Sequence, residues 1–196
     1  MAPSPCTELD GHARGRLLAL ARSVIASGCD QPAPATAAAS PPAALQAEQA
    51  VFVTLSRGGR LRGCIGSLEP QGPLAQAVAE AAHGAAFRDP RFPPLEAAEL
   101  ADLHIEISVL SPLSPLPVSS REALAAALRP GLDGLLLEDG PHRATFLPRV
   151  WEQLPDPRSF IAQLLHKAGL PPDHWSPTLR ARRYAAQSFG GQADRP

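Results

Sequence analysis

The segment Leu61-Arg62-Gly63-Cys64-Ile65-Gly66 contains the strongest indication of how this chain folds. The apolar residues 51–55 come shortly before it, and the glycine-rich residues 57–60 stand between the two runs. Two extended runs joined by a glycine-rich break predict a β-hairpin. Because alternate side chains of a strand share one face, we expect Leu61 and Ile65 to point into the core. Arg62 and Cys64 should project together from the opposite face.

Hydrophobic periodicity predicts further elements along the rest of the chain. Helices are expected over residues 7–27, 73–87, 119–128 and 156–169, and strands over residues 103–109, 135–137, 143–147 and 179–184. Residues 30–47 are rich in Pro and Ala and predict a surface loop. The order of these elements is not a regular βαβ alternation. It favours an α+β fold with a mainly antiparallel sheet and peripheral helices.

Several short motifs follow one another in a fixed order. After residues 61–66 come residues 87–94 (FRDPRFPP), residues 106–111 (EISVLS), Gly134, residues 145–150 (TFLPRV), residues 160–169 and Tyr184. Together they resemble the AMMECR-one domain family over about residues 13–189. The resemblance implies one compact α+β domain over residues 1–196, with two lobes and a groove between them.

The resemblance also implies partners and leaves two functions open. The chain is similar to the protein A component of the so-called AmmeMemoRadiSam system. The other components of that system are a Memo-family protein and a radical SAM enzyme. One function is an enzyme or enzyme subunit that acts on a small polar or anionic molecule together with those two proteins. The other is a non-catalytic partner or scaffold protein of that system.

The balance of charges argues against partners that are bound mainly through charge. Lys and Arg number 18 and Asp and Glu number 19, so the formal net charge is −1. A neutral chain has no general attraction to nucleic acid or to acidic membranes. A nucleic-acid-binding regulator is therefore the least favoured function. No apolar run approaches the ~20 residues that span a bilayer, so no membrane association is expected.

The cysteines indicate the expected compartment. Cys6, Cys29 and Cys64 are odd in number and have no C-x-x-C spacing. This pattern argues against a disulfide framework and against a cysteine-based zinc site. We expect the reducing cytoplasm as the setting, and we expect no metal and no cofactor.

Cys64 is the first candidate catalytic residue. The thiolate is the reactive form of cysteine, and a nearby arginine such as Arg62 lowers the pKa of a thiol. A nucleophile also needs a base, for which His83, His104 and His142 are candidates. The alternative is that Cys64 is a small buried hydrophobe beside two glycines.

Glu106 is the second candidate catalytic residue. In residues 103–109 the apolar side chains alternate with His104, Glu106 and Ser108, so that Ile105 and Ile107 should face the core. The polar stripe is either a solvated sheet face or a second polar wall opposite Arg62 and Cys64.

Five residues are candidates for substrate binding: Arg62, Gly63, Gly66, Arg88 and Arg91. A guanidinium can donate two parallel hydrogen bonds to a carboxylate or phosphate, and a glycine in a strand marks the close approach of a backbone or a ligand. Arg88 and Arg91 flank Asp89, so they either hold an anion or pair locally. The basic residues 180–183 are likewise either a solvated face or a phosphate site.

Overall fold

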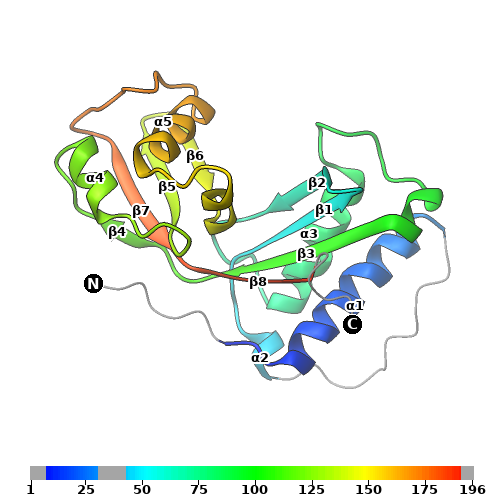
Figure 1. Ribbon diagram of the computed structural model, residues 1–196. Coiled ribbons are helices and arrows are strands. Elements are labelled where there is room, and N and C mark those ends of the chain that lie inside the picture. Colours follow the sequence, from blue (N-terminus) through cyan, green and yellow to red (C-terminus); the bar gives the residue numbers. More distant parts are fainter. Residues whose placement is uncertain (1–7, 31–42, 191–196) are drawn as a thin grey trace. The chain divides into compact units, whose positions relative to one another are not determined.

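The computed structural model describes residues 8–30 and 43–190 (Figure 1). The chain separates into two compact units. Within the described residues, the first unit comprises residues 8–30, 43–110 and 187–190, and the second comprises residues 111–186. Each unit has its own sheet and its own apolar core, so each is described by itself.

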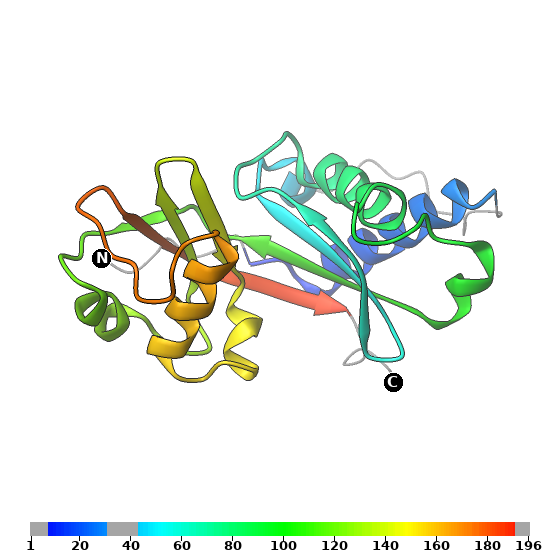
Figure 2. The ribbon, with the colours of Figure 1, turned by 90° about the horizontal axis from the view of Figure 1, so that it is seen from above.

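The first unit is a four-stranded sheet with two long helices on one face. Its helices are α1 (Gly11–Gly28), α2 (Ala43–Gln46), α3 (Leu74–Phe87) and the 3-10 helix η1 (Ala97–Asp102). Its strands are β1 (Val51–Arg57), β2 (Arg60–Gly66), β3 (Leu103–Leu110) and β8 (Ala186–Gly190), in the spatial order β2-β1-β3-β8. Figures 1 and 2 show α1 and α3 on the same face, with α3 packed on β1 and β2 and α1 on β3. Strand β2 lies at an edge of this sheet.

The predicted hairpin is present. Strands β1 and β2 pair in antiparallel fashion, and Gly58 and Gly59 form the turn with positive φ, which glycine adopts without a steric penalty. Ile65 packs against the core of the first unit, as predicted. The hairpin therefore supplies both the edge of the sheet and part of its buried face.

A β-bulge in the hairpin changes the direction of Leu61. Leu55 pairs with Gly63, but the next residue of β1, Ser56, pairs with Leu61. Arg62 is thereby the extra residue of the bulge, and an extra residue interrupts the alternation of side chains. The prediction that Leu61 is in the core is wrong, because this residue is 45% exposed. That Arg62 and Cys64 project from the same face stays a prediction.

The inner face of the sheet follows the predicted alternation in β3. Ile105 and Ile107 are buried, as predicted, and they lie opposite Leu55 and Val53 of β1. The helix predicted over residues 73–87 is also confirmed, and its apolar face is buried along its whole length: Leu74, Val78, Ala81 and Ala85. Burial of these two faces against each other forms the core of the first unit.

Two predictions near the N-terminus need correction. Helix α1 begins at Gly11 and not at residue 7, because the Asp10 side chain accepts a hydrogen bond from the Ala13 N–H and caps the helix. The loop predicted over residues 30–47 ends earlier than expected, since residues 43–46 form α2 and Leu45 is buried. Residues 31–42 of that prediction lie outside the described residues.

The second unit has a second four-stranded sheet. Its strands are β4 (Ser114–Leu116), β5 (Gly134–Asp139), β6 (His142–Phe146) and β7 (Arg180–Tyr184), in the spatial order β4-β7-β5-β6. Its helices are α4 (Arg121–Ala127), α5 (Pro157–Lys167) and the 3-10 helix η2 (Pro148–Glu152). The hairpin β5–β6, the strand β7 and the helix α5 with its Asp156 cap confirm the predictions for this region. Helix α4 begins at Arg121 after its cap Ser120, whereas the predicted range began at residue 119.

The fold class is α+β, as predicted. The strand pairs β1–β2, β1–β3, β4–β7, β5–β6 and β5–β7 are all antiparallel, and helices flank both sheets. No helix within residues 8–30 and 43–190 is long and apolar enough to cross a membrane. A single domain with a groove between two lobes stays a prediction.

Candidate functional site

The segment that follows α3 covers the free edge of β2. The Asp89 carboxylate accepts a hydrogen bond from the Cys64 backbone N–H at 2.8 Å, and the Arg91 Nη2 donates to the Cys64 carbonyl at 3.1 Å. Arg91 also donates to Asp89 through its backbone N–H, Nε and Nη2, at 3.1, 2.9 and 2.6 Å. An edge strand exposes unpaired backbone groups, and here side chains satisfy those of Cys64. The hydrogen bonds from Arg91, together with the one from Cys64, hold the pKa of Asp89 well below its usual value.

Arg62 is engaged in a similar way. Its Nε and Nη2 donate to the two carboxylate oxygens of Glu99 at 2.8 and 2.9 Å, and its Nη1 donates to the Pro93 carbonyl at 3.0 Å. The hydrogen bonds from Arg62 lower the pKa of Glu99 to about 2. The bulge in β2 aims Arg62 at this carboxylate. A ligand-binding role for Arg62 or Arg91 stays a prediction, and a ligand there competes with Glu99 or Asp89.

The two glycines of β2 are sites of close backbone approach. A Cβ at Gly63 would overlap the Ala85 carbonyl of α3, so only glycine lets the strand pack this closely on the helix. A Cβ at Gly66 would overlap the Val51 carbonyl. Of the two interpretations of these glycines, contact with the protein's own backbone is the one observed. Binding of a ligand to Gly63 stays a prediction.

Cys64 and Glu106 lie on the sheet face opposite the helices. The Thr54 hydroxyl of β1 donates to the Cys64 Sγ at 3.4 Å, and Thr54 is paired across the ladder with both Cys64 and Glu106. The polar stripe of β3 therefore shares the face of Cys64, as the second interpretation required. Neighbouring strands are about 4.8 Å apart, so the backbones of Cys64 and Glu106 are about 10 Å apart. Thr54 lies between them in the sheet, and their catalytic roles stay predictions.

The three candidate bases lie on three different elements, and their catalytic role stays a prediction. His83 packs against Phe87 on α3, with ring centroids 5.0 Å apart, on the helical side of the sheet. His104 is paired with Ser56 in the ladder, beyond Glu106 on β3. His142 belongs to the second unit, where its Nδ1 lies 2.9 Å from the Ala168 carbonyl oxygen. Among the described residues, no group of three or more His, Cys, Asp or Glu side chains is placed to hold a metal ion.

A hollow of about 200 Å³ lies where β1 begins and β2 ends, against α3. Its lining combines apolar residues of both strands and of α3 with six polar residues: Gln49, Ser67, Glu69, Gln71, Glu80 and Arg88. Arg88 is exposed, and within residues 8–30 and 43–190 its guanidinium forms no hydrogen bond or ion pair. The Oε1 atom of Gln49 is buried and has no hydrogen-bond partner there. The hollow brings together two predicted binding residues, Gly66 and Arg88.

Sequence reasoning missed five polar residues as members of this hollow: Gln49, Ser67, Glu69, Gln71 and Glu80. Glu80 had a detectable signal, because residues three apart share a face of a helix and Ala77 of α3 precedes it by three. Gln49 had none, since it precedes β1 in a segment with no motif. Cys64 does not line the hollow, because it points away from the face that Ile65 occupies.

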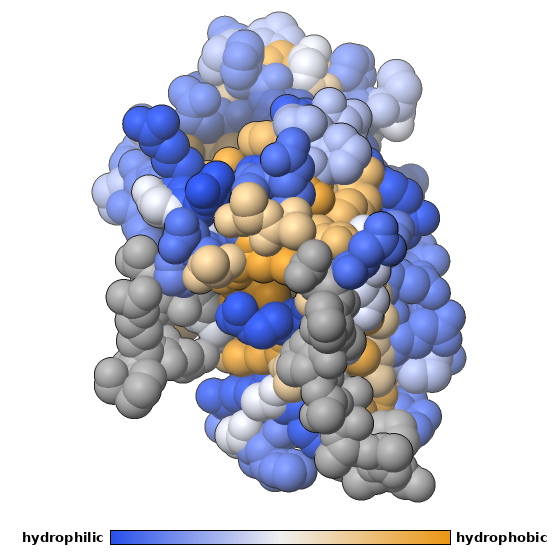
Figure 3. All heavy atoms as spheres, turned by 90° about the vertical axis from the view of Figure 1, so that its right-hand side faces the viewer, coloured by the Kyte–Doolittle hydropathy of each residue, from blue (hydrophilic) through white to orange (hydrophobic). Residues whose placement is uncertain are grey.

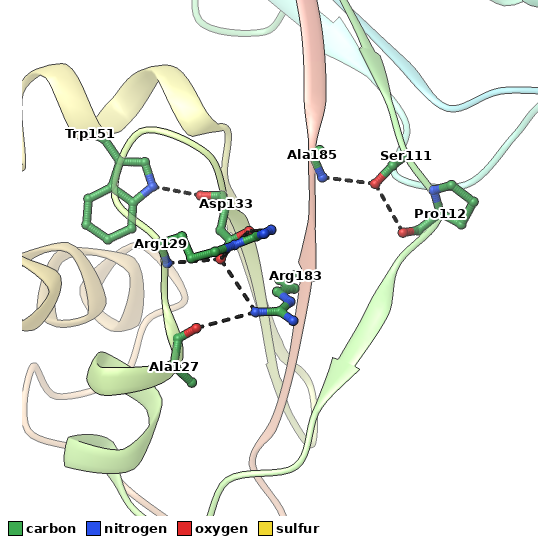
Figure 4. Close-up of polar contacts among 8 residues, drawn as sticks. All are labelled: Ser111, Pro112, Ala127, Arg129, Asp133, Trp151, Arg183 and Ala185. Carbon is green, nitrogen blue, oxygen red and sulfur yellow. Dashed lines mark hydrogen bonds and ion pairs between the residues drawn. The ribbon is translucent and has the colours of Figure 1, made fainter. Parts of the chain in front are cut away.

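The basic residues of β7 are neutralised inside the second unit. Figure 4 shows Arg129 and Arg183 converging on the buried carboxylate of Asp133, whose backbone carbonyl accepts a 2.7 Å hydrogen bond from the Trp151 indole N–H. Arg182 forms an ion pair with Glu138 at 3.3 Å. These contacts support the structural interpretation of the cluster over a phosphate site.

A second polar cluster of this unit surrounds Asp139. Thr178, His174 and Ser176 all bind its carboxylate, at 2.6, 2.7 and 2.7 Å, and their hydrogen bonds lower the pKa of Asp139 to about 2. The serine hydroxyl donates to the carboxylate and not to the histidine, so the cluster lacks the nucleophile–base contact of a hydrolytic triad. Its contacts join the segment before β7 to the end of β5.

Comparison with known proteins identifies the family. The AMMECR1 family model matches residues 18–189. A protein from Methanothermobacter thermautotrophicus is 45% identical over 150 residues, which cover 76% of this chain and 78% of that protein. Protein TK0174 from Thermococcus kodakarensis is 40% identical over 159 residues, with 76% and 75% coverage. The crystal structure of the uncharacterized protein PH0010 from Pyrococcus horikoshii matches at a TM-score of 0.85 and 32% identity, over 94% of each chain. The chain therefore belongs to the AMMECR1 family.

Proposed function

We propose that this protein is an enzyme or enzyme subunit for a small polar or anionic molecule, and that its hollow beside Arg88 binds a molecule of this kind. The observation that carries the proposal is a contrast among three arginines. Arg62 and Arg91 donate to carboxylates of the protein, whereas Arg88 stands exposed at the hollow without such a partner in the described residues. An arginine in this state is available to bind a carboxylate or phosphate group of a ligand.

The lining of the hollow supports the same proposal. Small-molecule sites are concave and mostly apolar, with a few polar groups that converge on the ligand. Here Val51, Ile65, Ala77 and Ala81 form the apolar part. A buried acceptor without a partner costs about 1–3 kcal/mol. A ligand that donates a hydrogen bond to the Gln49 Oε1 would remove that cost.

The reaction itself is proposed to involve Cys64 as nucleophile and Glu106 as acid or base. The Thr54 hydroxyl at 3.4 Å from Sγ supports a polar setting for the thiol. Because Cys64 and Ile65 point to opposite faces of β2, a ligand held in the hollow does not touch the thiol. Binding in the hollow and reaction at Cys64 are therefore separate parts of the proposal, and each needs its own test. The resemblance to the protein A component of the AmmeMemoRadiSam system is the reason to propose a Memo-like protein and a radical SAM enzyme as partners.

Titration with acetate and with inorganic phosphate, followed in two-dimensional amide NMR spectra, tests the binding part. We expect saturable shifts of the Gly66 and Ser67 amides and of the Gln49 side-chain amide. Arg88→Gln should abolish them, and Arg158→Gln, which removes an exposed arginine of α5 in the second unit, should not. If neither anion moves these signals, or if Arg88→Gln leaves them unchanged, the hollow is not an anion-binding site.

Metabolite profiling of a strain that lacks the protein tests the catalytic part. Complementation with the wild-type chain should restore the normal profile, whereas Arg88→Gln and Cys64→Ala should not. Restoration by Cys64→Ala would exclude the thiol as nucleophile. Restoration by both variants would favour the scaffold function.

The alternative function, a non-catalytic partner of the same system, is favoured by one observation in the first unit. An apolar hollow of about 180 Å³ is lined by Arg22, Ile25 and Ala26 of α1, Leu100 of η1, and Leu103 and Ile105 of β3. On the face drawn in Figure 3, apolar side chains gather around a hollow and a hydrophilic side chain lies among them. A hollow with an apolar lining can receive an apolar side chain of a partner protein. Under this alternative, Leu100→Lys should abolish co-purification with the Memo-family protein and the radical SAM enzyme, and Arg88→Gln should not.

A further inference from the structure

We propose that the hollow selects a small zwitterion, whose carboxylate binds Arg88 and whose ammonium group binds Glu80. This inference rests on the proposed binding function of the hollow and names the class of its ligand. It requires charges of both signs in one hollow, an acceptor oxygen that has no hydrogen-bond partner in the protein, and a volume suited to a small molecule.

Charges of both signs are held by the same helix. Glu80 lies within α3 and Arg88 directly follows its last residue, and both line the hollow. Eight residues of helix rise about 12 Å, so the two backbones are well separated along the helix axis. Within residues 8–30 and 43–190 the two side chains form no ion pair with each other, because neither has an ion-pair partner there. A ligand that carries both charges can bind each of them without breaking an existing pair.

The hydrogen-bonding groups near Glu80 are acceptors. Glu80 accepts one hydrogen bond, from the Gln76 Nε2 at 2.8 Å, and a carboxylate has capacity for several more. The Gln49 Oε1 is a buried acceptor without a partner in the described residues. An ammonium group has three donors and no acceptor, so it suits these oxygens. A second anionic group on the same ligand would be repelled by Glu80, which argues against a dicarboxylate in this hollow.

The remaining lining limits the size and middle part of the ligand. The hollow is also lined by Ala77 and Ala81 of α3 and by Val51 and Ile65 of the sheet. These apolar side chains suit the short alkyl part of such a molecule. At about 200 Å³ the hollow is smaller than the roughly 300–1,000 Å³ of sites for drug-sized ligands. A molecule of the size of an amino acid fits these limits.

A matched set of probes tests the charge requirement. The probes are L-norvaline and 5-aminopentanoate as zwitterions, pentanoate as the anion alone, and pentylamine as the cation alone. Dissociation constants are measured from the amide signals of Gly66 and Ser67 and the side-chain amide of Gln49. We expect at least one zwitterion to bind about tenfold or more tightly than either singly charged probe, which corresponds to about 1.4 kcal/mol.

Two variants that each remove one charge assign the ends of the ligand. In Arg88→Gln the partner of the carboxylate is lost, so the better zwitterion should bind no more tightly than pentylamine. In Glu80→Gln the partner of the ammonium group is lost, so the same zwitterion should bind no more tightly than pentanoate. Glutamine at position 80 keeps an acceptor for Gln76, and unchanged amide signals of the second unit verify the fold of each variant. Arg158→Gln serves as the control and should bind every probe like the wild type.

The outcomes separate this inference from the proposed function. If pentanoate binds as tightly as both zwitterions and Arg88→Gln abolishes its binding, the hollow is an anion site and the zwitterion inference is wrong. The same conclusion follows if Glu80→Gln leaves the affinity of the zwitterions unchanged. If none of the four probes moves the signals of the hollow, the binding function itself is contradicted.

Discussion

The substitution Asp89→Asn should destabilise the first unit, because this carboxylate accepts the hydrogen bond of the Cys64 backbone N–H at the edge of β2 and also holds Arg91 in place. Its side chain is 2% exposed and accepts hydrogen bonds from the Cys64 backbone N–H and from three nitrogens of Arg91. An asparagine offers a single acceptor oxygen, and its NH₂ group would face donors at the other position. At least one buried donor would then have no partner.

The size of the effect follows from the same contacts. A hydrogen bond to a charged group contributes about 1.5–3 kcal/mol, and an unsatisfied buried group costs about 1–3 kcal/mol. The Arg91 side chain is 52% exposed, so water solvates its charge after the substitution, and the larger penalty of a stranded buried charge does not apply. We therefore expect the free energy of unfolding of the first unit to fall by about 3 kcal/mol.

The effect should depend on pH in a defined direction. Hydrogen bonds from Arg91 and from the Cys64 N–H place the pKa of Asp89 far below its usual value in the folded state. Such a group contributes its full stability above the unfolded pKa of about 3.9 and loses it as the pH falls toward the folded pKa. The difference between wild type and Asp89→Asn should be full at neutral pH and should shrink below about pH 4.

The assay must report on the first unit. Trp151 and Trp175 both belong to the second unit, so tryptophan fluorescence is unsuitable. Far-ultraviolet circular dichroism during urea unfolding and hydrogen exchange of the Cys64 amide are the appropriate measurements. Asp102→Asn is the matched control, because Asp102 is 71% exposed and its 3.8 Å ion pair with Arg57 contributes less than about 1 kcal/mol. Equal unfolding of the two variants, with unchanged exchange of the Cys64 amide, would refute the reasoning.

Three further predictions concern the same unit. Glu99→Gln should lower the free energy of unfolding by about 2 kcal/mol at neutral pH, and in the wild type this contribution should disappear as the pH falls from about 4.3 to the folded pKa of about 2. Gly63→Ala should cost more than about 3 kcal/mol or prevent folding, since its Cβ would overlap the Ala85 carbonyl, whereas Gly15→Ala, in open space on α1, should stabilise by about 0.5–1 kcal/mol. Ile107→Ala should cost about 2–5 kcal/mol in urea unfolding, and a change below 1 kcal/mol would show that the site collapses fully.

The candidate site was only partly accessible to sequence reasoning. Gly66 and Arg88 were predicted as binding residues and do line the hollow, and Cys64 and Glu106 do share one face of the sheet. The partners of the other two arginines were not predictable in detail. Asp89 is 25 residues from Cys64, and Glu99 is 37 residues from Arg62, so no local pattern connects them. Gln49 belongs to the hollow only because α3 packs beside the start of β1.

The sequence by itself determined those helices and strands whose signals lie within a few neighbouring residues. The period of two in residues 103–109, the spacing of Leu74 to Ala85 and the Asp156-Pro157 start of α5 predicted a strand and two helices that the structure contains. Tertiary structure alone decided the strand order, the strands β4 and β8, and the exposure of Leu61. Strand β8 forms by pairing with a segment about eighty residues earlier, as the 2.8 Å contact between Ser108 and Ser188 illustrates. Alternation and capping act within a few residues, whereas pairing register and burial depend on which distant segment lies alongside.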